Sequence, residues 1–151
     1  MNKKLGVFVA AGLLSIVSTS AMAQFAKADD AVEYREAAMT LMSSHFGRMG
    51  PVVKKEIPYN KEQIKENVAL LNRLAALPWA AYAPGTEGGR AKPEVWSDAE
   101  GFKQAKVKYL DSLKPLTVAA DAGDFDALRV AFGNTAKSCK ACHDSYRAKK
   151  K

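Results

Sequence analysis

The sequence predicts an all-α fold, an antiparallel four-helix bundle. Four segments after residue 23 carry apolar residues at the alternating spacings of three and four that mark one face of a helix. No segment shows the strict alternation of apolar and polar residues that indicates a half-buried strand. One long connection, rich in Gly and Pro, separates the second helical segment from the third. Amphipathic helices joined in this way bury their apolar stripes most simply against one another in a bundle.

Residues 1–23 have the features of a cleaved secretory signal peptide. Two lysines stand near its start, residues 5–17 are largely apolar, and Ala-Met-Ala at 21–23 is the small-x-small pattern of a cleavage site. This run is short for a transmembrane helix, and no later run is long enough to span a bilayer, although an uncleaved anchor is the alternative. We therefore expect residues 24–151 to form one exported domain, most simply periplasmic and without membrane insertion.

The first helix is predicted from about Asp29 to Met49. Its stripe consists of six residues three or four positions apart: Val32, Arg35, Met39, Met42, Phe46 and Met49. Arg35 is the charged member, and an unpaired guanidinium buried there would be costly. Its side chain either pairs with an anionic group in the interior or extends along the edge of the stripe to water.

The second helix is predicted to begin at Asn60, whose side chain can form a capping box with Gln63. It continues until Pro78 stops it. Its apolar face consists of Ile64, Val68, Leu71 and Leu74. The following residues 78–96, PWAAYAPGTEGGRAKPEVW, have no period and are predicted to form a loop.

The third and fourth helices are predicted on either side of a turn at Gly123 and Asp124. Ser97 and Glu100 form a second capping box, which opens the third helix. The apolar face of that helix consists of Phe102, Tyr109, Leu113 and Leu116. The fourth helix carries seven residues on its inner side: Phe125, Leu128, Phe132, Cys139, Cys142, His143 and Tyr146.

Cys139, Cys142 and His143 form the sequence C-x-x-C-H, the attachment motif of c-type haem. On a helix, residues at positions i, i+3 and i+4 project from one face. The chemistry requires this arrangement, because each thiol adds to one of two neighbouring vinyl groups of the porphyrin and the adjacent imidazole reaches the iron. The motif, the export signal and the helical setting together predict one covalent haem c per chain, with His143 as an axial iron ligand.

Three other uses of the motif have less support. A disulfide between Cys139 and Cys142 would span one helical turn and constrain almost nothing. A thioredoxin-like redox pair requires a βαβ context, which an all-α chain lacks. A structural zinc site requires four ligands, and only His45 remains as another good candidate. We interpret His45 as a structural histidine.

The whole of residues 24–151 resembles the cytochromes c′, the class II cytochromes c. The resemblance is carried by the segments QFAK, DAVEYR, LMSSHFGRM, ALPWAAYAPGTEGG, WSDAEGFK and SCKACHDSYR. It implies a four-helix bundle with a pentacoordinate, high-spin haem, His143 as the proximal ligand and a homodimer built mainly through the first two helices. It also suggests binding of NO and CO on the distal side of the haem, with electron transfer as the other role.

The same resemblance assigns Arg35 to a haem propionate, which a guanidinium binds bidentately. It places Met39, one helical turn further on, at the distal side of the iron. There Met39 either crowds the iron as a steric gate or ligates it through the thioether, giving a six-coordinate, low-spin electron carrier. A gate of this kind offers bulk and no hydrogen-bond donor, which favours NO and CO over O₂.

Further residues are weaker candidates for contacts with the haem. Arg147 stands one turn after His143 and so near the proximal face, although cations are also common at helix ends. The loop supplies three candidates for the haem edge or its propionates, with exposed loop charge as the default interpretation: Trp79, Arg90 and Lys92. Glu36 departs from the family pattern, in which Gln stands near a propionate.

The net charge and the motifs of the sequence limit the classes of function that we expect. Removing Lys3 and Lys4 from 23 basic residues leaves 21 against 16 acidic ones, a formal charge of +5, and no nucleic-acid-binding motif is present. We expect either a gas-binding protein with a vacant iron position or an electron carrier that docks redox partner proteins through its cationic surface. We do not expect an enzyme, because the sequence shows no distal acid or base of the kind used in peroxide cleavage.

Overall fold

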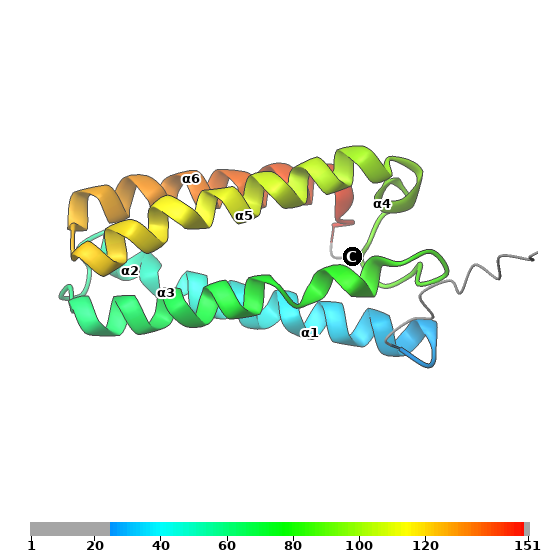
Figure 1. Ribbon diagram of the computed structural model, residues 1–151, viewed down its shortest axis with the longest axis horizontal. Helices are drawn as coiled ribbons and strands as arrows, with labels where there is room; N and C mark the ends of the chain where they lie inside the picture. The colour runs from blue at the N-terminus through cyan, green and yellow to red at the C-terminus, as the bar shows by residue number, and fades with distance from the viewer. Residues whose placement is uncertain (1–24, 150–151) are drawn as a thin grey trace, which may run out of the picture.

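Four long helices form an antiparallel bundle in the computed structural model, which describes residues 25–149 (Figure 1). They are α1 (Ala28–Gly47), α3 (Lys61–Ala75), α5 (Ala99–Ala122) and α6 (Phe125–Tyr146). Three short helical segments accompany them: α2 (Met49–Val53), the 3₁₀ helix η1 (Pro78–Tyr82) and α4 (Glu94–Ser97). The prediction of an all-α four-helix bundle is confirmed. The expected signal peptide, residues 1–23, lies outside the described residues. Within residues 25–149, no helix is both long enough and apolar enough to cross a membrane.

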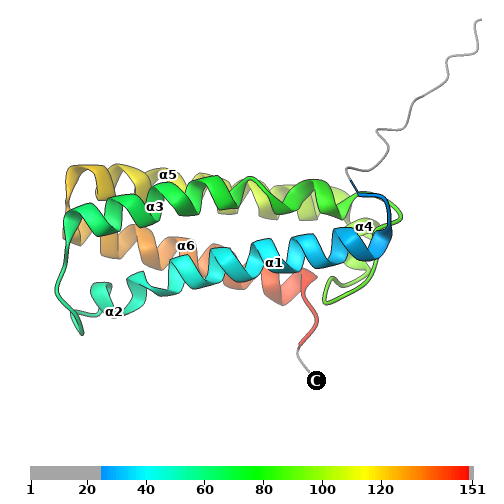
Figure 2. The same ribbon diagram turned by 90° about the horizontal axis from the view of Figure 1, so that it is seen from below.

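The four long helices follow one another around the bundle in the order α1, α3, α5 and α6. Figure 1 shows α5 with α6 in one layer and α1 with α3 in the other. The perpendicular view in Figure 2 shows α3 beside α5 and α1 beside α6. Of the pairs among the described helices, α5 and α6 have the most extensive contact, whereas α1 and α6 approach each other least among neighbours. This separation leaves room for a cavity.

Most of the predicted helix ends are found where the sequence placed them. The side chain of Asn60 accepts the backbone N–H of Gln63 at 3.1 Å and caps α3. Asp124 caps α6 in the same way, accepting the backbone N–H of Ala127 at 2.9 Å. Gly123 ends α5 with φ of +76°, a left-handed conformation that glycine adopts without strain. The predicted turn between the third and fourth helices is confirmed.

Two predictions about the long connection are wrong in detail. Residues 78–96 are not one irregular loop, because η1 opens this stretch and most of α4 lies at its end. The cap of α5 is Asp98, which accepts a backbone N–H of the first turn at 3.2 Å, and not Ser97, which belongs to α4. A helix of one turn carries too few apolar residues to reveal a period in the sequence.

The predicted apolar stripes face a common core. Their buried members include Met42, Met49, Ile64, Val68, Leu71, Leu74, Tyr109, Leu113, Leu116 and Leu128. Burial of each Leu or Met stabilises the fold by about 1.5–3 kcal/mol. Phe46 of α1 stacks on Phe132 of α6 with ring centroids 4.3 Å apart. This pair bridges the two helices that otherwise stay apart.

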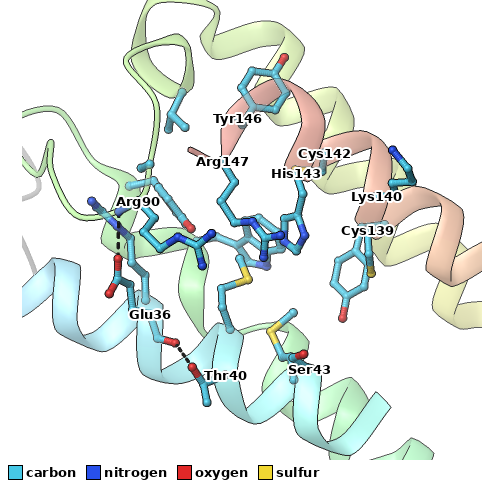
Figure 3. Close-up of a pocket in the computed structure, with 18 of the residues that line it drawn as sticks. Glu36, Thr40, Ser43, Arg90, Cys139, Lys140, Cys142, His143, Tyr146 and Arg147 are labelled. Atoms are coloured by element: carbon cyan, nitrogen blue, oxygen red, sulfur yellow. Dashed lines mark hydrogen bonds between the residues drawn. The ribbon is translucent and has the colours of Figure 1, made fainter. Parts of the chain in front are cut away.

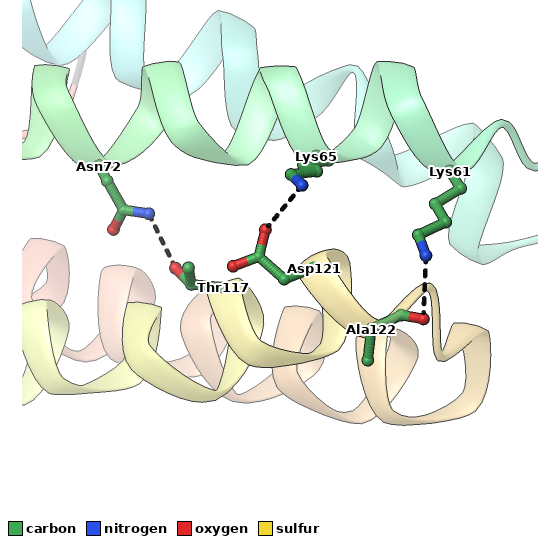
Figure 4. Close-up of polar contacts among 6 residues, drawn as sticks. All are labelled: Lys61, Lys65, Asn72, Thr117, Asp121 and Ala122. Atoms are coloured by element: carbon green, nitrogen blue, oxygen red, sulfur yellow. Dashed lines mark hydrogen bonds and ion pairs between the residues drawn. The ribbon is translucent and has the colours of Figure 1, made fainter.

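Polar contacts help to fix the register between α3 and α5 (Figure 4). The amide of Asn72 donates to the hydroxyl of Thr117 at 2.8 Å. Lys65 and Asp121 lie 3.8 Å apart at the exposed surface, where an ion pair contributes little to stability. The half-buried bond between Asn72 and Thr117 is therefore the stronger constraint on sliding of the two helices.

Arg35 joins α1 to the connection that follows η1. Its guanidinium donates from Nη1 to the carbonyls of Ala81 and Thr86 at 2.7 Å each, and from Nη2 to that of Gly88 at 2.8 Å. The ring of Tyr82 lies 4.8 Å from its central carbon. The partners of Arg35 within the described residues are thus neutral carbonyls, and its pairing with an anionic haem propionate stays a prediction. The alternative in which it reaches water is wrong, because the side chain is 1% exposed.

We expect Arg35→Met to lower the free energy of unfolding by roughly 3 kcal/mol or more, because it leaves buried carbonyls without donors. Arg35→Lys should recover part of this loss, since an ammonium lacks the planar fork that reaches several carbonyls at once. Urea unfolding followed by circular dichroism measures both. Arg73→Met, at an exposed position of α3, is the control. Equal stability of the Arg35→Met and Arg73→Met proteins would show that these bonds do not hold the connection.

Candidate functional site

A cavity of about 790 Å³ lies between α1 and α6, within the size range of small-molecule sites (Figure 3). Residues of α1, η1, the connection before α4, α5 and α6 form its walls. Nine of the ten residues that the sequence assigned to a haem site line it: Arg35, Glu36, Met39, Trp79, Arg90, Cys139, Cys142, His143 and Arg147. The tenth, Lys92, does not line the cavity, and its ammonium binds carbonyls at the end of α6 instead. The structure thus brings together segments that are far apart in the sequence, while their roles toward a haem stay predictions.

The three residues of the haem motif lie on the cavity side of α6. Cys139 and Cys142 are free, half-buried thiols one helical turn apart, and His143 follows directly. Burial raises the pKa of both thiols, and for Cys139 the neighbouring Cys142 raises it further. Both side chains are therefore neutral at pH 7.

His143 is held in its neutral form. Burial lowers the pKa of its imidazole, and the cations of Arg147 and Arg90 lower it further. Figure 3 shows all three residues around the same part of the cavity. Neutral imidazole is the form that binds a metal ion, so this environment favours ligation.

The donor set fits a covalent haem. Two thiols and an imidazole with the required spacing stand on the wall of a cavity that is largely apolar. Nε of Arg90 is buried and has no hydrogen-bond partner within residues 25–149. A buried donor without an acceptor is costly, and an anionic group in the cavity would satisfy it. The propionates of a haem are groups of this kind.

His45 does not belong to this site. Its Nδ1 lies 2.8 Å from the amide oxygen of Asn67 on α3, and the amide of Asn67 donates to the His45 carbonyl at 2.7 Å. The interpretation of His45 as a structural histidine is confirmed. Across residues 25–149, no group of three or more His, Cys, Asp or Glu side chains is arranged to hold a metal ion.

The α1 side of the cavity carries Met39 together with hydroxyl groups that the sequence analysis missed. Met39 is half-buried, and Thr40 and Ser43 line the cavity beside it. The hydroxyl of Thr40 donates to the carbonyl of Glu36 at 2.8 Å. The Thr40 hydroxyl is therefore already engaged, which leaves Ser43 as the hydroxyl beside Met39 with no hydrogen bond shown in the described residues, and the expected lack of a donor toward a distal ligand stays a prediction. The position of Ser43, four residues after Met39, was the signal that could have indicated a hydroxyl on this wall.

Residues 88–92, here called the strap, cross from α1 to the end of α6. The carboxylate of Glu36 accepts the backbone N–H of Arg90 at 2.9 Å. The guanidinium of Arg90 donates to the carbonyl of Ala148 at 3.0 Å. Gly89 has φ of +57°, and a Cβ there would stand 2.5 Å from the Glu36 carboxylate. Only glycine therefore allows the strap to approach α1 so closely.

Arg147 lies beyond the helix and not on it. α6 ends at Tyr146, and Arg147 has an extended backbone that forms an isolated bridge with Ala91. Its backbone N–H still donates to the carbonyl of His143 at 3.1 Å. The expected spacing of one turn is present, and the side chain of Arg147 points into the cavity beside His143 (Figure 3).

Aromatic side chains complete the walls. Trp79 lies on the cavity, as the sequence predicted for a haem edge, and its indole N–H donates to the carbonyl of Ala75 at 2.6 Å. Phe102 contacts Tyr82 and Tyr146 with ring centroids 5.0 and 5.3 Å away. Sequence periodicity indicated Phe102 and Tyr146 as core residues, whereas Tyr82 lies in a stretch without a pattern.

The chain is similar to known proteins over most of its length. The family model Cytochrome C′ matches residues 30–147. Cytochrome c′ of Alcaligenes xylosoxydans xylosoxydans is 62% identical over 127 residues, covering 84% of this chain and 100% of that protein. Cytochrome c′ of Rubrivivax gelatinosus is 43% identical over 129 residues, covering 83% of this chain and 100% of that protein.

Solved structures show the same fold. The nitric oxide complex of a variant of cytochrome c prime from Alcaligenes xylosoxidans is 61% identical, with a TM-score of 0.83 over 84% of this chain and 100% of that one. A second, ferrous variant with bound NO matches with the same identity, TM-score and coverage. A family match over most of the sequence, relatives of this identity and a shared fold show that this chain belongs to the cytochrome c′ family, whose members bind haem c covalently.

Proposed function

We propose that this chain is a periplasmic haem c protein with a pentacoordinate, high-spin iron that binds NO and CO, and that electron transfer is its second role. The observation that carries the proposal is the cavity with Cys139, Cys142 and His143 on its α6 wall and Met39 on its α1 wall. The NO complexes of cytochrome c prime from Alcaligenes xylosoxidans support it. Bound haem would supply an iron centre that takes up a diatomic gas and changes oxidation state.

The motif residues would attach and ligate the haem. Cys139 and Cys142 would form the thioether bonds, and His143 would be the proximal ligand. All three extend from α6, which packs closely along α5, so that one rigid element sets both attachment and ligation. Burial and the nearby cations keep the imidazole of His143 neutral and its lone pair available.

Arginines would bind the propionates. Arg90 has the strongest support, since its Nε is buried without a partner on the cavity wall. Arg147 points into the same cavity. Arg35 would contribute only the N–H groups that its loop carbonyls leave free. We do not propose a propionate contact for Glu36, because two carboxylates repel each other and Glu36 already holds the strap.

Met39 would crowd the distal side of the haem. It lies on α1, across the cavity from the helix that carries His143. Thioethers at helical spacing are usually packing groups, and in this role Met39 would leave the sixth position of the iron open. Direct ligation by Met39 would instead produce a six-coordinate electron carrier.

We also propose that residues 1–23 are a signal peptide and that residues 24–151 form the mature domain. A homodimer through α1 and α3 is supported by apolar side chains exposed on both helices. Leu41 on α1 is 48% exposed and Leu70 on α3 is 39% exposed. A partner surface would remove this apolar area from water.

The optical spectrum of the periplasm-matured protein tests the function. We expect high-spin ferric and ferrous spectra and a shift of the ferrous bands on addition of CO, because the sixth position is open. A low-spin spectrum that CO leaves unchanged would show that Met39 ligates the iron, and it would make electron transfer the main role. A spectrum without haem bands would contradict both roles.

Met39→Ala should raise the affinity of the ferrous protein for CO by roughly tenfold or more, equivalent to removing about 1.4 kcal/mol of steric cost. CO titration followed by absorbance measures it. Glu33→Ala, on the exposed side of α1, should bind CO as the unsubstituted protein does. An unchanged affinity in the Met39→Ala protein would rule out the steric role.

The intact mass of the denatured protein tests attachment and processing. We expect the mass of a chain beginning at Gln24 plus one haem, because thioether bonds survive denaturation. Replacing both Cys139 and Cys142 by Ser should remove the haem mass, whereas Ser145→Ala should retain it. Haem mass in the double variant would contradict attachment through these thiols, and a mass that includes residues 1–23 would contradict cleavage.

A further inference from the structure

The strap holds the C-terminal end of α6 at the edge of the cavity. The backbone N–H of Ala148 donates to the carbonyl of Arg90 at 2.9 Å, and the backbone N–H of Lys92 donates to the carbonyl of Tyr146 at 3.0 Å. At its other side the strap is bonded to Glu36 of α1. The last turn of α6 is therefore fastened to the opposite wall of the cavity.

Lys92 satisfies three of the last four carbonyls of α6. Its ammonium donates to the carbonyls of Asp144 at 2.8 Å and Ser145 at 3.2 Å, while its backbone N–H binds that of Tyr146. The last four carbonyls of an α-helix have no partner within the helix. The fourth, that of His143, accepts a backbone N–H from beyond the helix at 3.1 Å. The end of α6 is thus fully capped, mainly by one residue.

The position of the ammonium makes this cap effective. A cation at a helix C-terminus is stabilised by the partial negative charge of the terminal carbonyls. Both ammonium bonds lie at the exposed surface, so the cap depends on the number of carbonyls that Lys92 reaches and not on the exclusion of water. Lys140, a nearby cation on α6, instead binds the side chain of Asp144 at the exposed surface. Such a pair contributes little to holding the backbone.

We propose that Lys92 is a positioning residue for His143: its cap holds the last turn of α6 and thereby fixes the direction of the imidazole. Helix ends fray when their terminal groups lack partners. The thioether bonds would hold the turn before His143, whereas Lys92 binds three carbonyls in the turn after it. The hydroxyl of Tyr146 also donates to Asp98 at 2.7 Å, but this bond holds a side chain and leaves the terminal carbonyls to Lys92. The inference rests on the proposed function, in which His143 is the proximal iron ligand.

Resonance Raman spectra of the ferrous holoprotein test the proposal, together with hydrogen exchange of the amides of residues 143–147. We expect Lys92→Met to shift or broaden the iron–histidine stretching band. The amides should exchange roughly tenfold faster, as expected for the loss of hydrogen bonds from a charged donor. Lys92→Arg, which keeps a cationic donor, should restore both readouts. Lys137→Met, at an exposed position of α6, is the matched control and should change neither.

The two readouts distinguish a positioning role of Lys92 from a purely structural one. Faster exchange with an unchanged band would limit Lys92 to a structural role and overturn the proposal, as would no change in either readout. If the ferrous spectrum of the unsubstituted protein is high-spin and the iron–histidine band is absent, the proposed ligation by His143 itself is contradicted. If Lys92→Met does not retain haem, Lys92→Gln replaces it, since an amide can still reach one carbonyl. We then expect the iron–histidine band of the Lys92→Gln protein to shift from that of the unsubstituted protein. An identical band overturns the proposal.

Discussion

The hydrogen bonds from Arg35 to the carbonyls of Ala81, Thr86 and Gly88 are the constraint on which the rest of the site depends. The connection between α3 and α5 is irregular from Ala83 to Pro93, so its folded path requires partners for its polar backbone. Arg35 supplies them from within the bundle. The strap continues from Gly88, and its path places the guanidinium of Arg90 on the cavity.

The cavity exists because the helices of the bundle are not packed equally closely. α5 and α6 pack along each other and present the haem motif on a rigid surface, whereas α1 stays apart from α6. Residues that face the gap, such as Met39, Phe46 and Cys139, are consequently half-buried and not fully buried. A haem attached to α6 would fill this gap and bury their apolar surface, so that cofactor and core become one packing unit.

The α6 wall and the α1 wall of the cavity would have different roles in the proposed function. The α6 side would supply attachment and a neutral imidazole, because burial lowers the pKa of His143 and the cations of Arg147 and Arg90 lower it further. The α1 side would control what reaches the iron, through the bulk of Met39 and the hydroxyl of Ser43 nearby. The strap is bonded to α1 and to the end of α6. A displacement of either helix would therefore shift the other through the strap.

The sequence by itself determined the helices, most of their ends and the chemistry of the motif. These features depend on spacings within one segment, such as the cap of Asn60 on α3 or the turn that separates Cys139 from Cys142. The tertiary structure decided the partners of Arg35, which lie 46 to 53 positions away, and the buried nitrogen of Arg90. Such contacts depend on the path of a loop that has no periodicity, and that path is set only when the helices pack.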